Sequence, residues 1–470
     1  MRKKVNYKKA STYYLIGNIF NKGISFLTVP IFTRMLSTSD YGVVTTYNSW
    51  IAILAMIIGF ALHMGIRAAF IDYRKVIDDF MSVVVTFTIS FGLCFITVTI
   101  LVSYLININA SMCLIILCLF QSMSSALIED YSMYLMMQYK YKLRTALMVL
   151  PNLISAILSI IAIELALNPE KLYLDRIIPT AIIYIIFAVV IAVLVFSRSH
   201  IFRNSAYLKY GITISAPLIL HGIALNILSQ SDRTMITWLA NASQTGIYSL
   251  IYNFSMIATV LTTSLDGVWV PWFTEQYKNY HIKKINMVAI DYVHLITYAM
   301  VALILIGPEI VHLLASQKYW GGITIIPPVV LSNYFIFLYT FYVNVEHFHK
   351  KTTYITINTL IAAITNIALN YLFIPKYGYV AAAYTTLISY LIALILHANY
   401  AKKMNKTIYP IKIFLPSLVH IAAASLIFYL LLNSGLLRWI IACLYIIIMA
   451  LVNKNKILNF FPTIATKFKR

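Results

Sequence analysis

The segment Ser11–Met35 is apolar enough to cross a membrane, yet it carries a lysine at its centre. Asn18, Lys22 and Ser25 recur at spacings of four and three, which places them on one side of a helix. A charged side chain at mid-membrane costs about 2.5–3.5 kcal/mol on insertion scales. Lys22 is therefore expected to face a polar interior, where its ammonium group could attract phosphate oxygens.

Three further apolar segments carry polar side chains at helical spacing. These stripes are Gly59, His63 and Arg67; His221, Ser229, Asp232 and Arg233; and Tyr248, Tyr252, Ser255, Thr259, Thr262 and Asp266. One such stripe usually serves helix–helix hydrogen bonding. Four of them predict a hydrated central cavity, in which Lys22, Arg67 and Arg233 could pair with phosphate.

Internal pairing is the alternative explanation for these charges. Asp232 and Arg233 would then neutralise one another or bond to adjacent helices, and Arg67 would extend to the membrane interface. Glu129, Asp130 and Asp266 also fall within apolar segments. Either these acids stabilise their surroundings through partners, or one of them takes up a proton or sodium ion that couples transport.

The composition indicates a polytopic membrane protein. Of the 470 residues, 61% are hydrophobic and only 11% are charged, with mean hydropathy +0.82, whereas soluble proteins carry about 25% charged residues. Long apolar runs favour an all-α fold, because barrel strands would alternate over about ten residues. We predict about 14 transmembrane helices, with 12 as the alternative, at residues 12–35, 42–66, 80–105, 111–137, 146–167, 177–197, 211–240, 245–272, 288–308, 323–346, 353–374, 379–400, 413–433 and 436–452.

The basic residues predict the orientation. With a cytoplasmic N-terminus, 28 of the 36 lysines and arginines fall in inner segments and six in outer ones, so both termini are expected to be cytoplasmic. The net charge of +21 is spread in small groups between apolar spans, which argues against nucleic-acid binding.

The sequence motifs that would indicate an enzyme are missing. The chain contains no nucleotide-binding or hydrolase motif, and its four cysteines form no CxxC pair, so we expect no cofactor, no metal site and no catalytic residues.

Similarity between two segments of the sequence suggests that the chain consists of two related halves. Leu36 to Gly42 precedes a span with Tyr47 and Asn48, and Leu239 to Gly246 precedes one with Tyr252 and Asn253. We predict a six-helix bundle in 1–210, a second in 211–412, and two additional helices with a basic cytoplasmic tail in 413–470. The substrate path would lie between the two bundles.

The chain resembles polysaccharide flippases of the Wzx type, in the superfamily that includes multidrug exporters and lipid II flippases. The resemblance rests on the basic start with the run Asn18 to Arg34, on Leu36 to Gly42, on Ser231-Asp232-Arg233 followed by Thr245 to Ser249, and on Pro375 to Ala383. It implies two six-helix bundles around a V-shaped cavity that opens alternately to each side of a bacterial inner membrane.

The resemblance also implies a substrate. A polyprenyl-pyrophosphate-linked oligosaccharide would move from the cytoplasmic to the outer leaflet, for O-antigen and other lipopolysaccharide, capsule or exopolysaccharide synthesis. Lys22, Arg67 and Arg233 match basic cavity positions of related flippases, whereas Asp266 lies in a span where a basic residue is common. Suggested partners are a polysaccharide polymerase and a chain-length regulator.

Three alternatives remain. A non-transporting scaffold for a polysaccharide assembly complex is opposed by the polar side chains predicted to line a cavity. A cation-coupled drug exporter would share the fold, but such exporters commonly have an acid in the first span, where Lys22 lies. A membrane-embedded polymerase or glycosyltransferase is opposed by the short outer connections, which leave little room for acid–base residues.

Overall fold

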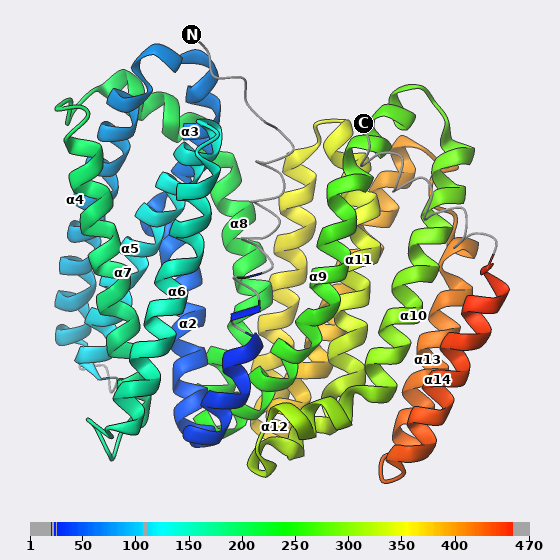
Figure 1. Ribbon diagram of the computed structural model, residues 1–470. Coiled ribbons are helices and arrows are strands. Elements are labelled where there is room, and N and C mark those ends of the chain that lie inside the picture. Colours follow the sequence, from blue (N-terminus) through cyan, green and yellow to red (C-terminus); the bar gives the residue numbers. More distant parts are fainter. Residues whose placement is uncertain (1–19, 21–22, 25, 107–110, 455–470) are drawn as a thin grey trace. The chain divides into compact units, whose positions relative to one another are not determined.

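The computed structural model describes residue 20 and residues 23–24, 26–106 and 111–454, and throughout these residues it contains helices and no strand. The helices in Figure 1 are α2 (Thr38–Gly59), α3 (Leu62–Asp72), η1 (Arg74–Val76), α4 (Ile77–Leu105), α5 (Met112–Met137), α6 (Tyr141–Glu164), α7 (Leu172–Phe196), α8 (Ser205–Leu239), α9 (Ala242–Lys278), α10 (Ile282–Leu314), η2 (Gln317–Ile325), α11 (Ile326–Phe348), α12 (Thr352–Met404), η3 (Ile411–Ile413), α13 (Leu415–Leu430) and α14 (Gly435–Val452). The predicted all-α fold is confirmed.

The helices account for the predicted spans. Among the described residues, nine helices are long and apolar enough to cross a membrane, and the bent helix α8 makes a tenth. Shorter apolar helices lie at Phe26–Met35 and Leu415–Leu430. α12 is 53 residues long, more than twice the roughly 20 residues that one crossing needs, and it contains two of the predicted spans. The protein is therefore a multi-pass membrane protein.

The chain forms two compact units. Unit 1 consists of Met1–Gly246 and Thr359–Tyr379, and unit 2 of Ile247–Asn358 and Val380–Arg470. The units are defined by contacts within the folded chain, and both α9 and α12 contribute residues to each of them. The bundle boundaries predicted at residues 210 and 412 stay a proposal.

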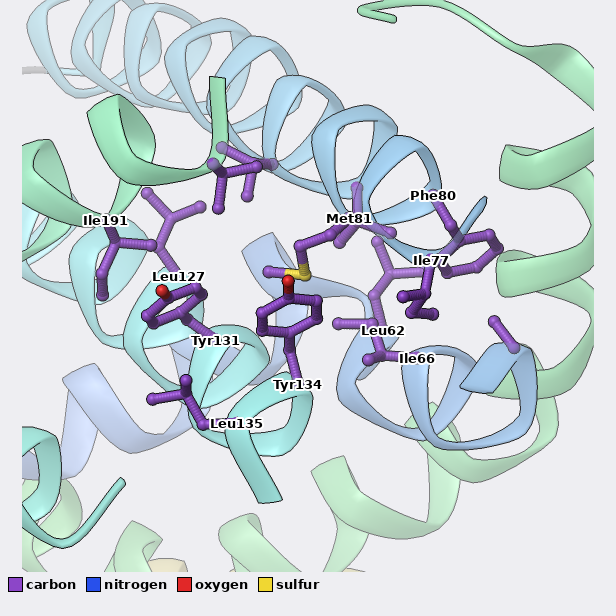
Figure 2. Close-up of a cluster of buried hydrophobic side chains, with 14 of the residues drawn as sticks. Leu62, Ile66, Ile77, Phe80, Met81, Leu127, Tyr131, Tyr134, Leu135 and Ile191 are labelled. Carbon is purple, nitrogen blue, oxygen red and sulfur yellow. The ribbon is translucent and has the colours of Figure 1, made fainter. Parts of the chain in front are cut away.

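Unit 1 has a core built from α3, α4, α5 and α7. Leu62 and Ile66 of α3 pack with Phe80 of α4 and Tyr134 of α5, and each of these side chains is at most 2% exposed (Figure 2). The apolar side chains recur every three or four residues along each helix, so that one stripe per helix faces this core. Arg198, just beyond α7, donates a hydrogen bond to the Tyr134 hydroxyl (3.0 Å), which in turn donates to Asp78.

α2 and α9 begin side by side at a crossing of two glycines. A Cβ atom on Gly42 would collide with the carbonyl oxygen of Ala242, and one on Gly246 with the carbonyl oxygen of Thr38. The hydroxyls of Thr38 and Ser243 are 2.7 Å apart across the same contact. The two segments with similar sequences thus contact each other reciprocally. Glycine is needed at both positions because the two backbones approach so closely.

The predicted span 42–66 is broken. α2 ends at Gly59, Phe60 and Ala61 adopt left-handed backbone conformations with φ 51° and 47°, and α3 begins at Leu62. The Phe60 ring packs edge-on against Phe91, with 5.1 Å between centroids. Ser215 of α8 donates a 3.0 Å hydrogen bond to the Ala61 carbonyl, which satisfies part of the interrupted backbone.

α12 contains a second break, at Gly378. Its φ of 59° and ψ of −143° are not helical, so one residue joins two helices. The side-chain oxygen of Gln244 occupies the place where a Cβ atom would stand and accepts a 3.0 Å hydrogen bond from the Tyr379 backbone N–H. Few residues other than glycine tolerate this conformation.

Unit 2 is organised around α10, which packs against α11, α13 and α14. The side chain of Asn286 in α10 holds the segment before η3. It donates a 2.8 Å hydrogen bond to the Thr407 carbonyl and accepts one of 2.9 Å from the Tyr409 N–H. Burial raises the pKa of the Tyr409 hydroxyl well above its usual value, so this tyrosine stays neutral.

Candidate functional site

Three of the predicted site residues, Asn18, Lys22 and Ser25, lie outside the described residues. The others divide between the two compact units. His63, Arg67, Glu129, Asp130, Ser229, Asp232 and Arg233 belong to unit 1, and Tyr252, Ser255, Thr259 and Asp266 belong to unit 2.

Asp232 lies in a buried polar cluster between α8 and α12. Its carboxylate accepts a 2.7 Å hydrogen bond from Asn370, whose side-chain amide also donates to Asn366 (3.1 Å). The hydroxyl of Ser231 donates to the same Asn366 oxygen at 3.3 Å. Asp232 is 1% exposed, and both asparagines are 0% exposed. An acid in this setting is stabilised by amide donors, as expected if it bonds to an adjacent helix.

Arg233 points to a second network, between α8 and α2. Its guanidinium donates to the Gln230 side chain at 2.7 Å and to the Ser229 carbonyl at 3.1 Å. Ser49 of α2 donates to the same Gln230 oxygen at 3.3 Å. Arg233 is buried, with 5% exposure. Some of the guanidinium donors that could bind a phosphate are already used in hydrogen bonds within α8.

The break between α2 and α3 affects the second predicted stripe. Gly59 lies on α2, whereas His63 and Arg67 lie on α3, so the prediction of one continuous helical face through these three residues is wrong. Arg67 is exposed. Phe60 and Ala61, both left-handed, end the first helix, and contacts with Phe91 and Ser215 of other helices hold them in place.

His63 and the two acids of α5 lie together in unit 1. His63 Nδ1 is 3.8 Å from the carboxylate of Glu129, whose side chain is 61% exposed. Asp130 is only 2% exposed, and its carboxyl group lies near the backbone of His63 and the hydroxyl of Thr88. A buried carboxyl group needs such polar neighbours.

The polar ladder of α9 is used, in part, for contact with α11. Asn333 of α11 donates a 3.1 Å hydrogen bond to Ser255 and accepts one of 3.1 Å from Thr259. Ser255 is fully buried and Tyr252 is 7% exposed, while Asp266 is half-buried. These bonds are of the helix–helix type that the sequence leaves as the alternative for a single stripe.

A pocket of about 420 Å³ lies beside the break in α12. It is lined by Leu239, Ala240, Gln244 and residues 374–379. Lys376 and Tyr377 are exposed there; an ammonium group can pair with anions, and a tyrosine side chain can contact sugars. None of these residues is among the predicted site residues, although Pro375 to Ala383 carries part of the family resemblance.

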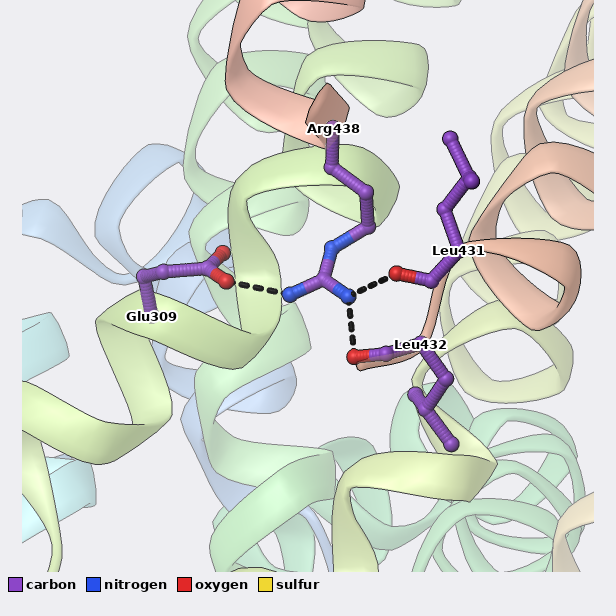
Figure 3. A network of polar contacts seen from close by, with 4 residues as sticks. All are labelled: Glu309, Leu431, Leu432 and Arg438. Carbon is purple, nitrogen blue, oxygen red and sulfur yellow. Dashed lines mark hydrogen bonds and ion pairs between the residues drawn. The ribbon is translucent and has the colours of Figure 1, made fainter. Parts of the chain in front are cut away.

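Two ion pairs of unit 2 were not predicted from the sequence. Arg438 is 1% exposed; it pairs with Glu309 and donates to the carbonyls of Leu431 (2.6 Å) and Leu432 (Figure 3). The second pair joins Glu346 to His397. In each pair the partners are more than 50 residues apart in sequence, so no local spacing connects them.

Basic groups also gather where α5 and α7 end and α6 begins. Burial and the charge of Arg198 lower the pKa of Lys140, whereas the carboxylate of Asp78 opposes this shift. Ser199 donates a 2.6 Å hydrogen bond to Asp79. This end is the one predicted to be cytoplasmic, and its acids satisfy the groups of neighbouring helix ends.

Comparison with known proteins gives both family and fold. A family model described as a polysaccharide biosynthesis protein matches residues 7–276, more than half of the chain. An uncharacterized membrane protein of Haemophilus influenzae is 21% identical over 365 residues, covering 76% of this chain and 87% of that protein.

Two solved structures are similar throughout. A lipid II flippase, MurJ, in an inward closed conformation is 18% identical and has a TM-score of 0.68, covering 95% of this chain and 99% of the flippase. An inward-facing multidrug resistance transporter is 14% identical with a TM-score of 0.59, covering 84% of this chain and 98% of that one. The chain therefore belongs to the polysaccharide biosynthesis protein family, and it shares the fold of a lipid II flippase and of a multidrug resistance transporter.

Proposed function

We propose that this protein is a flippase that moves a polyprenyl-pyrophosphate-linked oligosaccharide from the cytoplasmic to the outer leaflet of a bacterial inner membrane. The observation that carries the proposal is the family match over residues 7–276, joined to a fold shared with a lipid II flippase over 95% of the chain. The distribution of basic residues supports cytoplasmic termini. A polysaccharide polymerase and a chain-length regulator are the partners that this role would require, in an O-antigen, capsule or exopolysaccharide pathway.

In this proposal two helical bundles, 1–210 and 211–412, enclose a cavity that opens to each side in turn. Lys22, with Asn18 and Ser25 on the same helical face, and Arg67 are the groups that would hold the pyrophosphate. Arg233 would join them only after exchanging its bond to Gln230, at 2.7 Å, for a phosphate oxygen. His63, Ser229, Asp232, Tyr252, Ser255 and Thr259 would line the cavity.

Coupling to an ion is a separate part of the proposal. Asp130, Glu129 and Asp266 are the carboxyl groups that the sequence suggests for it. Asp130 is buried, Glu129 is the most exposed of the three, and Asp266 is half-buried. Replacement of Asp266 by asparagine tests the role of its charge.

The second candidate is a cation-coupled exporter of small molecules. It is favoured by the likeness to multidrug transporters, with a TM-score of 0.59. Under this alternative, a strain without the protein becomes sensitive to toxic cations, and its lipid-linked glycans stay normal.

Deletion of the gene tests the proposed function directly. We expect a lipid-linked oligosaccharide to accumulate on the cytoplasmic side, where a membrane-impermeant glycan-cleaving enzyme added to intact spheroplasts cannot reach it. Complementation with Lys22→Ala should fail at normal protein abundance, Lys22→Arg should restore part of the export, and Lys75→Ala, at an exposed position, should restore all of it. Normal lipid-linked glycan in the deletion strain would refute the proposal.

Labelling of engineered cysteines tests the cavity. In a background where Cys94, Cys113, Cys118 and Cys443 are replaced, cysteines at positions 229 and 259 should react with a water-soluble thiol reagent added to membranes. Failure of both to react would remove the hydrated path.

A further inference from the structure

The pocket beside the break in α12 is complete within one compact unit. Its volume is about 420 Å³, within the range of roughly 300–1,000 Å³ that is typical of small-molecule sites. The end of α8 and the first turn of α9 contribute part of the lining, and residues 374–379 of α12 contribute the rest. All of these residues belong to unit 1.

The charge of the pocket comes from one side chain. Lys376 is the one charged residue in its lining; it is exposed, and no acid among the described residues forms an ion pair with it. The acid at the start of α2, which crosses α9 close to this point, is Asp40, and its carboxylate accepts hydrogen bonds from the backbone N–H and the hydroxyl of Ser37. The pocket thus offers a positive charge and has no carboxylate in its lining.

The amide of Gln244 adds hydrogen-bond donors to the pocket. Its oxygen accepts the 3.0 Å hydrogen bond from the Tyr379 backbone N–H, and this bond fixes the orientation of the amide, because an N–H needs an acceptor. The Nε2 group carries two N–H donors, and within the part of the chain that the structure describes no acceptor bonds to it. A Cβ atom on Gly378 would lie 3.2 Å from Nε2, so the glycine leaves this amide uncovered.

These groups suit the phosphate of an ester. A phosphate accepts hydrogen bonds through several oxygens, and a lysine ammonium binds it as a point charge. A metal cation would require carboxylate or imidazole ligands, and the lining contains neither. The ring of Tyr377, 65% exposed, provides a surface for the group to which the phosphate is attached.

The position of the pocket limits where such a phosphate comes from. The distribution of basic residues predicts that 241–244 and 375–377 are outer connections, so the pocket is expected to face the outer side of the membrane. Two kinds of molecule carry a phosphate ester there: a lipid-linked glycan that has reached the outer leaflet, and an anionic phospholipid.

We propose that this pocket binds the phosphate group of a lipid at the outer surface of the membrane. The Lys376 ammonium pairs with the phosphate, and Gln244 Nε2 donates a hydrogen bond to it. Where the lipid is the lipid-linked glycan, which rests on the proposed function, the pocket holds the pyrophosphate after transfer to the outer leaflet and before release.

Protection of an engineered cysteine tests the site in the purified full-length protein. In a background without the native cysteines, Ala240→Cys introduces a thiol in the pocket lining, and Ser39→Cys introduces one at an exposed position of α2 outside it. In nanodiscs of neutral lipid, inorganic pyrophosphate should slow the reaction of the thiol at position 240 with an uncharged, water-soluble maleimide. The reaction at position 39 should not change. A thiol at position 240 that does not react even without pyrophosphate overturns the proposal.

Substitutions in the lining identify the groups that bind. Lys376→Ala and Gln244→Glu should each raise the pyrophosphate concentration needed for protection by roughly tenfold or more, as expected for loss of a hydrogen bond to a charged group. Gln244→Glu keeps an acceptor for the Tyr379 N–H, so it removes only the donors. Lys171→Ala, which removes an exposed lysine outside the lining, is the matched control and should keep full protection. Equal protection in the wild type and Lys376→Ala overturns the proposal.

The lipid composition separates the two sources of phosphate. In nanodiscs that contain phosphatidylglycerol, without pyrophosphate, slow reaction at position 240 that Lys376→Ala restores to the rate in neutral lipid assigns the pocket to a phospholipid headgroup. Protection by pyrophosphate alone assigns it to the lipid-linked glycan. Protection by neither overturns the phosphate site.

Glycan export in cells measures the role of the pocket in transport. Lys376→Ala at normal abundance should lower export severalfold without abolishing it, because the pocket acts after the substrate has crossed. Wild-type export by Lys376→Ala overturns this role. Protection at position 240 in Lys22→Ala protein should equal that of the wild type, since Lys22 belongs to the proposed central path. If deletion of the gene leaves lipid-linked glycans normal, the proposed function is wrong, while protection at position 240 still decides whether the phosphate site exists.

Discussion

Substitution of Gly42 by alanine tests the reciprocal crossing of α2 and α9. The new Cβ atom would collide with the Ala242 carbonyl oxygen. This oxygen belongs to the backbone at the start of α9, so it cannot rotate away as a side chain would. The two helix ends must therefore move apart, and the 2.7 Å contact between Thr38 and Ser243 must lengthen.

The expected magnitude follows from two opposing effects. Overpacking of a close contact costs about 1–3 kcal/mol, while alanine is favoured over glycine within a helix by about 1 kcal/mol. Because the collision is with backbone, the overpacking cost should lie in the upper half of its range. We expect a net loss of about 1–2 kcal/mol. At about 2.1 cal/mol/K of unfolding entropy per residue, this loss lowers Tm by roughly 1–2 °C for a chain of 470 residues that unfolds as one unit.

Thermal unfolding in detergent, followed by intrinsic fluorescence, measures this loss. Gly222→Ala is the matched control, since its Cβ would meet only the flexible end of Met56. Gly246→Ala should resemble Gly42→Ala. The double variant Gly42→Ala/Gly246→Ala should lose less than the sum of the two, because one separation of the helices accommodates both methyl groups. A Gly42→Ala protein as stable as Gly222→Ala would refute the close crossing.

Two further predictions concern buried polar groups, and both are measured as changes in thermal unfolding. Asn370→Leu removes the amide donor of Asp232 and should cost about 1–3 kcal/mol, whereas Asp232→Asn should cost less; the reverse order would contradict the hydrogen bond. Glu309→Met leaves the buried Arg438 guanidinium without its carboxylate and should destabilise by about 3 kcal/mol, toward the lower end for a buried pair because Glu309 is 27% exposed. Adding Arg438→Met should recover part of this loss, and a double variant less stable than either single variant would count against the pair.

The sequence predicts the fold well because apolar length and spacing are local properties. Helices lie at each predicted span within the described residues, and the charge pattern needs no knowledge of contacts. The breaks are different. The segment from Gly59 to Leu62 contains no proline that would break the helix. Its left-handed residues instead follow from tertiary contacts, namely the packing of Phe60 against α4 and the hydrogen bond of Ala61 with Ser215.

The candidate site was predictable only in part, for the same reason. The polar types of Asp232 and Arg233 stand out in an apolar segment, but their partners come from α12 and α2, far along the chain. A signal for α12 does exist: Asn366 and Asn370 lie four residues apart on one face of a span. Glu346 and His397 had no such signal, since each is a single polar residue near a span end.

The break at Gly378 has a consequence for movement. Two helices joined by one residue have no loop to take up a displacement, so any change in their mutual direction must be a rotation about the φ and ψ bonds of Gly378 itself. The hydrogen bond from the Tyr379 N–H to Gln244 resists that rotation. A single amide side chain, contributed by the first turn of α9, thereby holds the backbone of α12 at the point where its two helices meet.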